Sequence, residues 1–401
     1  MNWICCQLGA REHYAVARAL HRNGILQGLF TDAWISPGKP LGLLKRPLRE
    51  RYHVELAGAN VFSANVSLLA FEAQVRLKGL KGWNRIMARN QWFQKQALRQ
   101  LSSIVHRPSS LEAPTVFAYS YAARDIFRWA KAQGWRTVLG QIDAGPEMSR
   151  IVQRLEQRYQ EYQSHSDCPP EVYWKGWREE CALADRIIVN SDWSRKAMEM
   201  EGIDTGKVRV IPLAYSPPAD SIAFRREYPA AFSPQRPMRI LFLGQVNLAK
   251  GLVPLLETVD LMLGEPVEFS IVGPVHVVLP EKWRRHPQIR WLGSVPRGQA
   301  AEHYRSADVF LFPTFSDGFG LTQLEAQAWQ LPVVASRFCG DVVKDGLNGR
   351  QLEDVSAADI AQALRRLLAA PAELTRMARA SGVGPQFSLA GIAAQLDSVM
   401  D

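Results

Sequence analysis

The 401-residue sequence lacks the features of several common protein classes. It has no run of 18 or more uncharged apolar residues, so the pattern excludes a membrane-spanning helix. Met1-Asn2-Trp3 leads directly into an apolar run without a basic segment, so we expect no signal peptide. There is no C-x-x-C pair, and the eight histidines are scattered, so no zinc-site spacing is present. We expect reduced, buried thiols at the five cysteines, positions 5, 6, 168, 181 and 339.

Acidic residues are scarce in the first quarter of the chain. Residues 1–111 contain 16 lysines and arginines but only five acidic residues, whereas residues 112–401 contain 32 and 34. The net charge of +9 therefore originates in the first quarter. This asymmetry indicates an anionic surface or partner on one side of the molecule.

The stretch 73–111 combines this basic excess with apolar side chains. Trp83, Met87 and Leu98 lie at helix-compatible spacings, a pattern typical of an interfacial helix that docks on an anionic membrane. The alternative is a helix that packs its aromatic residues on its own domain and exposes a basic face. No nucleic-acid-binding module accompanies the charge, so we expect no nucleic-acid partner. The basic residues are Arg76, Lys78, Lys81, Arg85, Arg89, Lys95, Arg99 and Arg107, with a second cluster at Lys45, Arg46, Arg49 and Arg51.

Apolar residues, by contrast, are plentiful. Hydrophobic residues make up 47% and charged residues 22% of the chain, which is typical of a folded protein, and the length suits two large domains. Two regions alternate short apolar strand-like runs with helical patterns, the signature of parallel α/β sheets. We predict strands at 3–6, 28–31, 114–118, 137–142 and 186–190, and then at 239–244, 267–272, 289–293, 308–312 and 332–335. We predict helices at 14–23, 122–133, 149–163, 251–263, 321–329 and 389–400.

Proline density marks a linker between the two regions, because prolines at positions 217, 218, 229, 234 and 237 interrupt both patterns. We therefore expect an N-terminal domain at 1–215, a linker at 216–238, a C-terminal domain at 239–385 and a final helix within 386–401. Two doubly wound domains joined in this way leave a cleft at the carboxyl ends of both sheets, where ligands of such sheets bind.

Two segments carry chemistry suited to that cleft. After the strand ending at Phe312, a loop with Gly318 and Gly320 leads into a helix, whose free N–H groups favour a phosphate. Glu325 lies one turn into this helix, where a carboxylate can accept two hydrogen bonds from vicinal hydroxyls. In the segment 243–251, Lys250 would present a positive charge suited to a diphosphate leaving group. The alternatives are a tight βα turn with an exposed acidic residue and a solvated surface lysine.

Together these segments resemble the retaining glycosyltransferases of family 4, whose GT-B fold has two Rossmann-like doubly wound domains facing a central cleft. The resemblance covers most of the C-terminal domain in the family's order, whereas the first 120 residues match only through Gly9 and the helix at 17–20. It implies that the C-terminal tail crosses back to the N-terminal domain. The matching segments are 184–191, 208–212, 242–251, 271–273, 292–296, 307–313, 317–325, 331–335 and 345–349.

The resemblance also implies roles by position. Glu325 would hold the ribose of a nucleotide-sugar donor, and Lys250 would neutralise its diphosphate together with the N–H groups of the helix that begins at Leu321. Asp317 and the loop after it would face the donor sugar, Val295 would bracket the base, and Gly9 would approach the phosphate from the opposite wall. The implied donor-binding residues are Gly9, Gln245, Val295, Gly318, Phe319, Gly320, Leu321, Thr322 and Glu325, and the implied catalytic residues are Lys250, Asp317, Glu325 and Asp143.

Three positions depart from the family pattern. Gln245 replaces the arginine that usually stands five residues before the lysine, so Lys250 must supply more of the charge on the leaving group. Asp317 replaces the first glutamate of the family motif and is one methylene shorter. Asp143 stands where a histidine often lies near the reacting carbon, and it is interpreted either as an acceptor-contacting residue or as a loop or capping aspartate.

The implied activity is transfer of a hexose from a nucleotide diphosphate-sugar to a sugar or lipid-linked acceptor, with retention by front-face attack. No D-x-D triplet occurs, so we expect neither a metal requirement nor a cofactor. The expected location is cytoplasmic, peripheral on the inner face of a membrane through 73–111. The alternatives are a catalytically weak nucleotide-sugar-binding subunit, suggested by Gln245, and a GT-B nucleotide-sugar epimerase.

Overall fold

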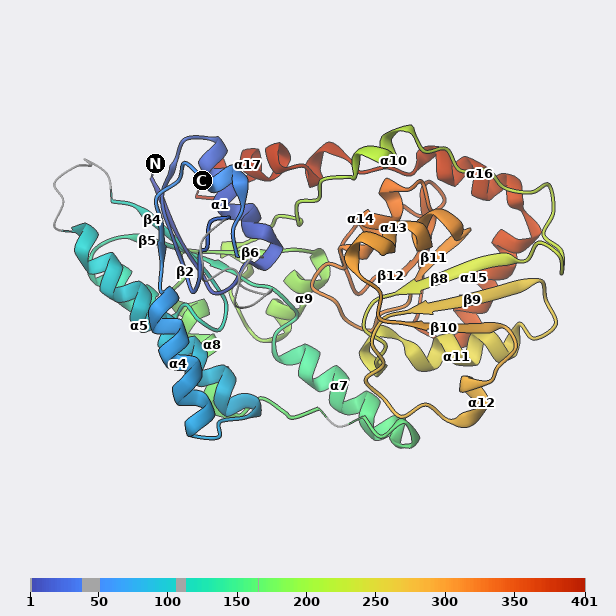
Figure 1. The fold of residues 1–401 in the computed structure, drawn as a ribbon, viewed down its shortest axis with the longest axis horizontal. Helices are drawn as coiled ribbons and strands as arrows, with labels where there is room; N and C mark the ends of the chain where they lie inside the picture. The colour runs from blue at the N-terminus through green and yellow to red at the C-terminus, as the bar shows by residue number, and fades with distance from the viewer. Residues whose placement is uncertain (1, 38–50, 106–112, 165, 401) are drawn as a thin grey trace.

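A computed structural model describes residues 2–37, 51–105, 113–164 and 166–400 of the chain. The first half of the chain forms a parallel sheet of seven strands in the order β3-β2-β1-β4-β5-β6-β7 (Figure 1). Its central strands are buried on both faces, as in parallel sheets generally, and all five residues of β1 and of β4 are buried. The strands are β1 (Trp3–Gln7), β2 (Leu26–Thr31), β3 (Val61–Ser63), β4 (Thr115–Tyr119), β5 (Arg136–Gly140), β6 (Arg186–Val189) and β7 (Val208–Val210).

Helices cover both faces of this sheet (Figure 1). The amphipathic helix α1 buries Val16, Ala17 and Leu20 against β1 and its neighbours, while α5 and α6 bury Phe93 and Phe127 on the other side. The helices of this domain are α1 (Ala15–Arg22), α4 (Asn65–Leu77), α5 (Gly82–Val105), α6 (Arg124–Ala132), α7 (Pro146–Arg158), α8 (Glu171–Leu183) and α9 (Asp192–Met200).

The second half of the chain repeats the plan with six parallel strands in the order β10-β9-β8-β11-β12-β13. In both sheets the strand order runs outward in one direction from the first strand and then in the other. The point beside the first strand is the topological switch point of doubly wound folds. The strands are β8 (Met238–Leu243), β9 (Val267–Val272), β10 (Ile289–Gly293), β11 (Val309–Phe312), β12 (Val333–Ser336) and β13 (Gly349–Leu352). The helices are α11 (Leu252–Leu261), α12 (Glu281–Arg284), α13 (Arg297–Ser306), α14 (Thr322–Ala328), α15 (Ala357–Ala369) and α16 (Pro371–Ala380).

The prediction of two doubly wound α/β domains is confirmed, and the strands that the sequence pattern predicted are present. The pattern missed β3, β7 and β13, because strands of three or four residues with polar members are too short to give a periodic signal. It also missed several surface helices, among them α8, α13 and α15.

Two helices tie the domains together. The last helix, α17 (Leu389–Asp397), packs on α1, where Leu389, Ile392 and Leu396 join the cluster that contains Leu20. Figure 1 shows the two chain ends close together on the N-terminal domain. The other helix is α7 of the N-terminal domain. It packs Ile151 into the core of the C-terminal domain, and the short turn after α7 adds Tyr162 to the same core.

Arginines fix the connection between the domains, which contains α10 (Ala219–Ala223). Arg236 forms a bidentate ion pair with Asp308, at 2.6 and 2.7 Å, and Arg239 also binds this carboxylate. Burial alone would raise the pKa of Asp308, whose residue is 1% exposed, but the hydrogen bonds from the two arginines outweigh burial and lower it. A third arginine, Arg226, donates to backbone carbonyls of the C-terminal domain, those of Tyr304, Ala307, Trp329 and Gln330.

We expect Arg236→Ala to lower the free energy of unfolding by about 3 kcal/mol, because a buried carboxylate loses its bidentate partner while Arg239 remains. Urea unfolding at pH 7 measures this loss. Since the pKa of Asp308 is lowered in the fold, its contribution is present above the ordinary carboxyl pKa of about 3.9 and is lost as the pH falls through the lowered value. The difference between wild type and variant should therefore shrink below about pH 4, and a constant difference would contradict this role of Asp308.

Candidate functional site

A cavity of about 370 Å³ lies between the two domains, at the carboxyl ends of β5, β6, β8 and β11. The N-terminal wall consists of Arg11, Glu12, Ile142, Asn190 and Leu213. The C-terminal wall consists of Phe242, Leu243, Gly244, Lys250, Phe312, Asp317, Phe319, Gly320, Leu321 and Thr322. Six of the predicted site residues line this cavity, and Gly318 lies within the loop that lines it. The six are Lys250, Asp317, Phe319, Gly320, Leu321 and Thr322.

Lys250 and Asp317 form an ion pair at this cavity. The side chain of Asn247 caps the short turn before Lys250 by accepting a hydrogen bond from the Lys250 amide at 3.0 Å. Gly251 follows with φ +76°, and a Cβ there would lie 1.9 Å from the carbonyl oxygen of Pro313. Only glycine allows this approach, which brings the lysine to the end of β11 and thus to Asp317.

The loop after β11 is shaped by its own carboxylate. Oδ1 of Asp317 accepts a hydrogen bond from the Phe319 amide at 3.1 Å, while Oδ2 receives the lysine. The hydroxyl of Thr322, at the start of α14, is buried and has no hydrogen-bond partner among the described residues. Thr322 lines the same cavity as Lys250, and an unpaired buried hydroxyl there is a group that a bound anion would satisfy.

The two domains approach each other closely at Gly318. A Cβ at Gly318 would lie 2.2 Å from the carbonyl oxygen of Ile142, which follows β5 of the other domain. Beside it, the indole N–H of Trp193 donates to the hydroxyl of Ser316 at 2.9 Å, and both groups are buried. The cleft is therefore held narrow at its base.

Glu325 lies one turn into α14, half-buried, outside the residues that line the cavity. Its Oε2 accepts a hydrogen bond from the hydroxyl of Tyr304 at 2.6 Å. No described group donates a hydrogen bond to Oε1. One carboxylate oxygen is thus fixed, and the other remains for a ligand.

Asp143 is positioned by three hydrogen bonds, all to Oδ1. They come from the hydroxyl of Tyr121 at 2.6 Å, the amide of Gly145 at 2.9 Å and the side chain of Gln141 at 3.0 Å. Burial raises the pKa of Asp143, and these donors together with the charge of Arg11 act in the opposite direction. Asp143 thus bends the loop between β5 and α7, as expected for a loop aspartate, and its Cα adjoins Gly318.

Gly9 does not line the interdomain cavity but lies next to a buried carboxylate. Its amide donates to Oδ1 of Asp32 at 3.0 Å, and Asp32 is fully buried. Arg89 binds the other oxygen of Asp32, Oδ2, at 2.9 Å. The guanidinium of Arg51 lies 3.5 Å from Oδ1. One arginine of the basic stretch is thus used inside the domain.

Two further predicted donor-binding residues, like Gly9 and Glu325, are not among the described residues that line the cavity. Gln245 is exposed and is not among the described residues that line it. Val295 is half-buried and packs against the cluster around Phe312 and Leu331. Sequence reasoning missed Arg11, which lines the cavity opposite Lys250, although its position two residues after Gly9 was an available signal.

The aromatic residues of the basic stretch point inward. Phe93 is buried, Trp92 stacks on Phe71 with 5.1 Å between ring centroids, and Trp83 packs on Tyr173. These contacts correspond to the alternative in which the helix packs its aromatic residues on its own domain. Arg107 and the cluster members Lys45, Arg46 and Arg49 lie outside the described residues.

The described residues contain neither a metal-ligating cluster nor a membrane-spanning helix. No group of three or more His, Cys, Asp and Glu side chains in the described chain could hold a metal ion. None of the described helices combines the length and the apolar character that crossing a membrane requires.

We expect Gly318→Ala to lower the free energy of unfolding by about 1–3 kcal/mol, because its methyl group would push the loop away from Ile142. We also expect a larger radius of gyration from small-angle scattering as the cleft opens. Gly298→Ala is the matched control, since a Cβ there meets no atom within 4 Å. Equal stability and dimensions for both variants would show that this contact does not hold the cleft narrow.

Part of this site lies in a segment that is similar to known proteins. Residues 237–370 match the family model "Glycosyl transferases group 1". A similar curated protein is the D-inositol 3-phosphate glycosyltransferase of Geodermatophilus obscurus, 34% identical over 211 residues, which are 47% of this chain and 46% of that protein. The chain spans about half the length of the curated relatives it matches.

Solved structures resemble the chain over its whole length. Sucrose-phosphate synthase from Thermosynechococcus elongatus superimposes with a TM-score of 0.65 at 16% identity, covering 100% of this chain and 98% of that one. Anabaena HepE in complex with UDP superimposes with a TM-score of 0.61 at 13% identity, covering 100% and 99%. At these identities the likeness establishes the fold, which is GT-B. The resemblance noted in the sequence is thereby confirmed: residues 237–370 form a Glycosyl transferases group 1 domain within a GT-B fold.

Proposed function

We propose that this chain is a retaining glycosyltransferase that moves a hexose from a nucleotide diphosphate-sugar to a sugar or lipid-linked acceptor. The observation that carries the proposal is the Lys250–Asp317 pair, which lines the interdomain cavity together with the glycine loop and Thr322, whose hydroxyl has no partner among the described residues. The family match of the domain that holds this pair supports it.

The donor would lie along the C-terminal wall. Lys250, the hydroxyl of Thr322 and the start of α14 at Leu321 would stabilise the diphosphate as it leaves, because charge develops there in the transition state. Glu325 would hold the ribose through its remaining oxygen. HepE, a structural neighbour, was solved with UDP, which supports a nucleoside diphosphate ligand for this wall.

Transfer with retention would then need little covalent chemistry from the protein. In front-face attack, the acceptor hydroxyl bonds to the anomeric carbon on the side from which the diphosphate departs and gives its proton to the departing phosphate. The chain's task is to hold the two substrates in line and to exclude water. The narrow base of the cleft at Gly318 suits that task.

Arg11 bears on the choice between an enzyme and a weak binding subunit. Gln245 brings no charge and lies outside the cavity lining, but Arg11 lines the cavity from the opposite wall. A second cation near the diphosphate is thus available from the N-terminal domain. This favours transfer over the binding-subunit alternative, and the Asp317/Glu325 motif favours it over the epimerase alternative.

We expect Lys250→Ala to lower kcat by about 10²–10³-fold, the loss typical of removing one group that stabilises a developing anion. The assay is transfer or hydrolysis of UDP- and ADP-sugars in the presence of EDTA, because we propose that no metal takes part. Lys282→Ala is the matched control, since Lys282 is an exposed lysine paired with Asp260 on the far side of the domain. Donor binding by thermal shift, without transfer or hydrolysis in the wild type, would favour the binding-subunit alternative instead.

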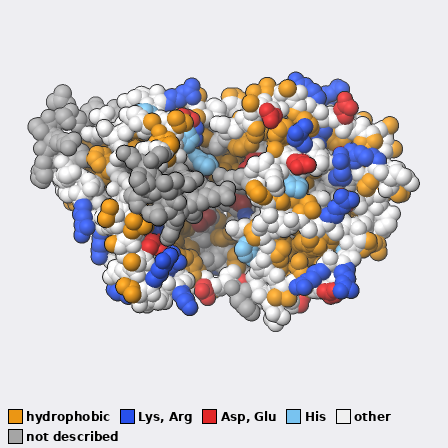
Figure 2. All heavy atoms as spheres, viewed as in Figure 1, with side chains coloured by type: hydrophobic (Ala, Val, Ile, Leu, Met, Phe, Trp, Pro, Cys, Tyr) orange, Lys and Arg blue, Asp and Glu red, His pale blue; other side chains and the backbone are white. Residues whose placement is uncertain are grey.

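We further propose that the hairpin of α4 and α5 docks the enzyme on an anionic membrane surface, so that the protein is peripheral on the cytoplasmic face. Leu77, at the tip of the hairpin, is 89% exposed, and its neighbours Arg76, Lys78 and Lys81 are also exposed. Figure 2 shows lysine and arginine side chains along the lower left of the molecule, where Figure 1 places α4 and α5. An exposed leucine within a ring of cations suits insertion between anionic headgroups.

We expect Leu77→Glu to reduce binding to anionic vesicles at least tenfold in co-sedimentation, since burying a leucine contributes about 1.5–3 kcal/mol. The control is Leu263→Glu, which changes a leucine that is 62% exposed on the other domain. Binding should also weaken with salt and be absent on neutral vesicles. Equal, salt-independent binding to both vesicle types would refute the proposal.

A further inference from the structure

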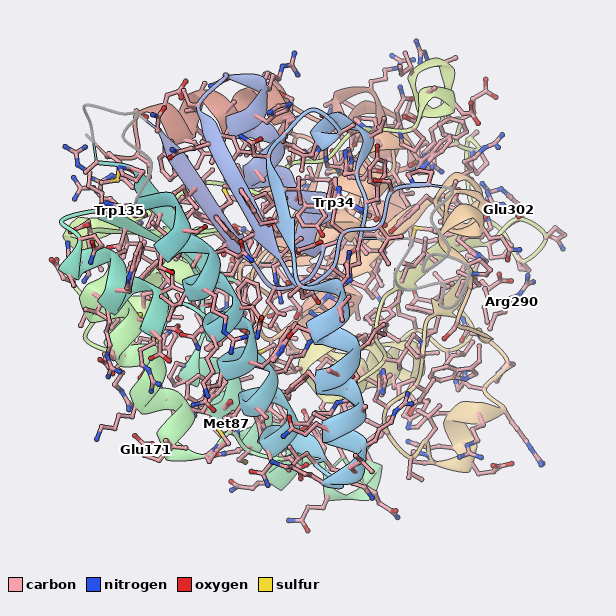
Figure 3. All side chains as sticks on the ribbon, turned by 60° about the vertical axis from the view of Figure 1, so that its left-hand side comes forward. Trp34, Met87, Trp135, Glu171, Arg290 and Glu302 are labelled. Carbon is pink, nitrogen blue, oxygen red and sulfur yellow. The ribbon has the colours of Figure 1, made fainter. Side chains whose placement is uncertain are left out.

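A second cavity, of about 240 Å³, lies in the N-terminal domain and is lined by Asp143, the residue after Ile142 of the interdomain cavity. It is enclosed by the start of α5, the first turns of α7 and the start of α8 (Figure 3 labels Met87 on α5 and Glu171 at the start of α8). Pockets for drug-sized ligands hold about 300–1,000 Å³. This cavity therefore suits a single ring.

Aromatic rings form much of its wall. Tyr121 and Tyr173 stack with 4.9 Å between centroids and an interplanar angle of 18°, and Trp83 packs on Tyr173 at 4.9 Å. Trp174 lies against both tyrosines and also lines the cavity. A wall of aromatic rings offers flat apolar surfaces to the C–H faces of a sugar ring.

The backbone is strained to hold this wall in place. Tyr121 has φ +75°, a conformation that is unfavourable for a bulky residue. The buried carboxylate of Glu180 binds the Tyr121 amide at 2.6 Å and the amides of Ala123 and Arg124 at 2.8 and 3.1 Å. Strain that the surrounding structure enforces in this way is often found at ligand sites.

The base of the cavity offers one free acceptor. The three hydrogen bonds to Asp143 all end on Oδ1, and no described group donates to Oδ2. Asp143 lines the cavity, and its Cα lies beside Gly318 of the loop expected to face the donor sugar. A hydroxyl bound to Oδ2 would therefore lie near the reacting end of the donor.

The charge of the residues that line the cavity disfavours an anionic ligand. No lysine or arginine is among the described residues that line it, whereas Asp143 and Asp167 both do. A phosphate group entering here would meet two carboxyl groups and no cation, an unfavourable arrangement. Neutral hydroxyls, by contrast, can donate hydrogen bonds to both.

We propose that this aromatic cavity binds the acceptor through a neutral sugar ring, with an acceptor hydroxyl donating to Oδ2 of Asp143. The proposal rests on the glycosyltransferase function above, and it selects among acceptors. The chain takes an unphosphorylated ring, in contrast to the phosphorylated inositol named for its curated relatives. The ring stacks on the aromatic wall, and the hydroxyl to be glycosylated points towards Gly318.

Cys168 provides a natural probe of this cavity. It lies on the rim and is exposed, whereas the other four cysteines are buried. Its sulfur accepts a hydrogen bond from Gln153, another lining residue. A thiol reagent such as 5,5′-dithiobis(2-nitrobenzoate) should therefore modify Cys168 alone in the folded protein, and a ring bound in the cavity should slow that reaction.

The experiment measures the rate of Cys168 modification in the full chain, with and without UDP, as methyl hexopyranosides, myo-inositol or inositol 3-phosphate are added up to their solubility limits. We expect at least one neutral methyl hexopyranoside to slow modification at least fivefold and inositol 3-phosphate to have no effect. Ser149→Trp, which fills the cavity from α7, should abolish protection. Gln157→Trp, on the same helix but outside the lining residues, should retain it.

Three results would overturn the proposal. They are protection by inositol 3-phosphate without protection by neutral sugars, protection by UDP alone, and no protection by any methyl hexopyranoside with or without UDP. None of these depends on catalysis, because no transfer is measured. Failure of the proposed function would instead appear as a donor that neither binds nor reacts at the Lys250 site.

Discussion

The close approach of Gly318 to the carbonyl of Ile142 is the contact on which the rest of the site depends. It brings the loop after β11 against the end of β5, and so joins the carboxyl ends of two sheets built from separate halves of the chain. Lys250 reaches Asp317 only because Gly251 lets its loop lie against Pro313. Two backbone approaches, each too short for a side chain, thus assemble the charged part of the cavity.

The same contact sets the relation between the two cavities. Ile142 borders the interdomain cavity, and the next residue, Asp143, lines the aromatic cavity. A donor in the first and an acceptor ring in the second would meet at this one turn of chain. The helix α5 connects the aromatic cavity to the basic hairpin tip. Trp83, near the start of α5, lines the cavity, and the basic, exposed tip of the α4–α5 hairpin lies just before Trp83 in the sequence. A lipid-linked sugar held at a membrane would have a short path to this cavity.

Sequence reasoning predicted the strongly periodic elements and the C-terminal half of the site. Buried parallel strands such as β1 and β9 are continuous apolar runs, and the loops that carry Lys250 and Asp317 follow them directly, so sequence position alone locates these residues at the sheet edge. It missed Arg11 and could not determine that Gln245 and Val295 do not line the cavity, because which side of a turn faces the cleft depends on the opposite domain. It also could not determine that Trp83 and Phe93 face inward, since an amphipathic helix has the same pattern on a membrane as on a protein core.

The sequence by itself determined that two doubly wound domains are present, where the proline-rich connection lies, and that the positive charge is concentrated in the first 111 residues. These properties follow from local periodicity and composition, which do not require knowledge of distant contacts. Only the tertiary structure decided that Asp143 keeps one free carboxylate oxygen and that Arg89 is paired with Asp32. It also decided that four aromatic side chains line a cavity whose described lining residues include no lysine or arginine. The physical reason is that each of these facts concerns groups from different elements, whose distances are set by how helices pack on a sheet rather than by their order in the chain.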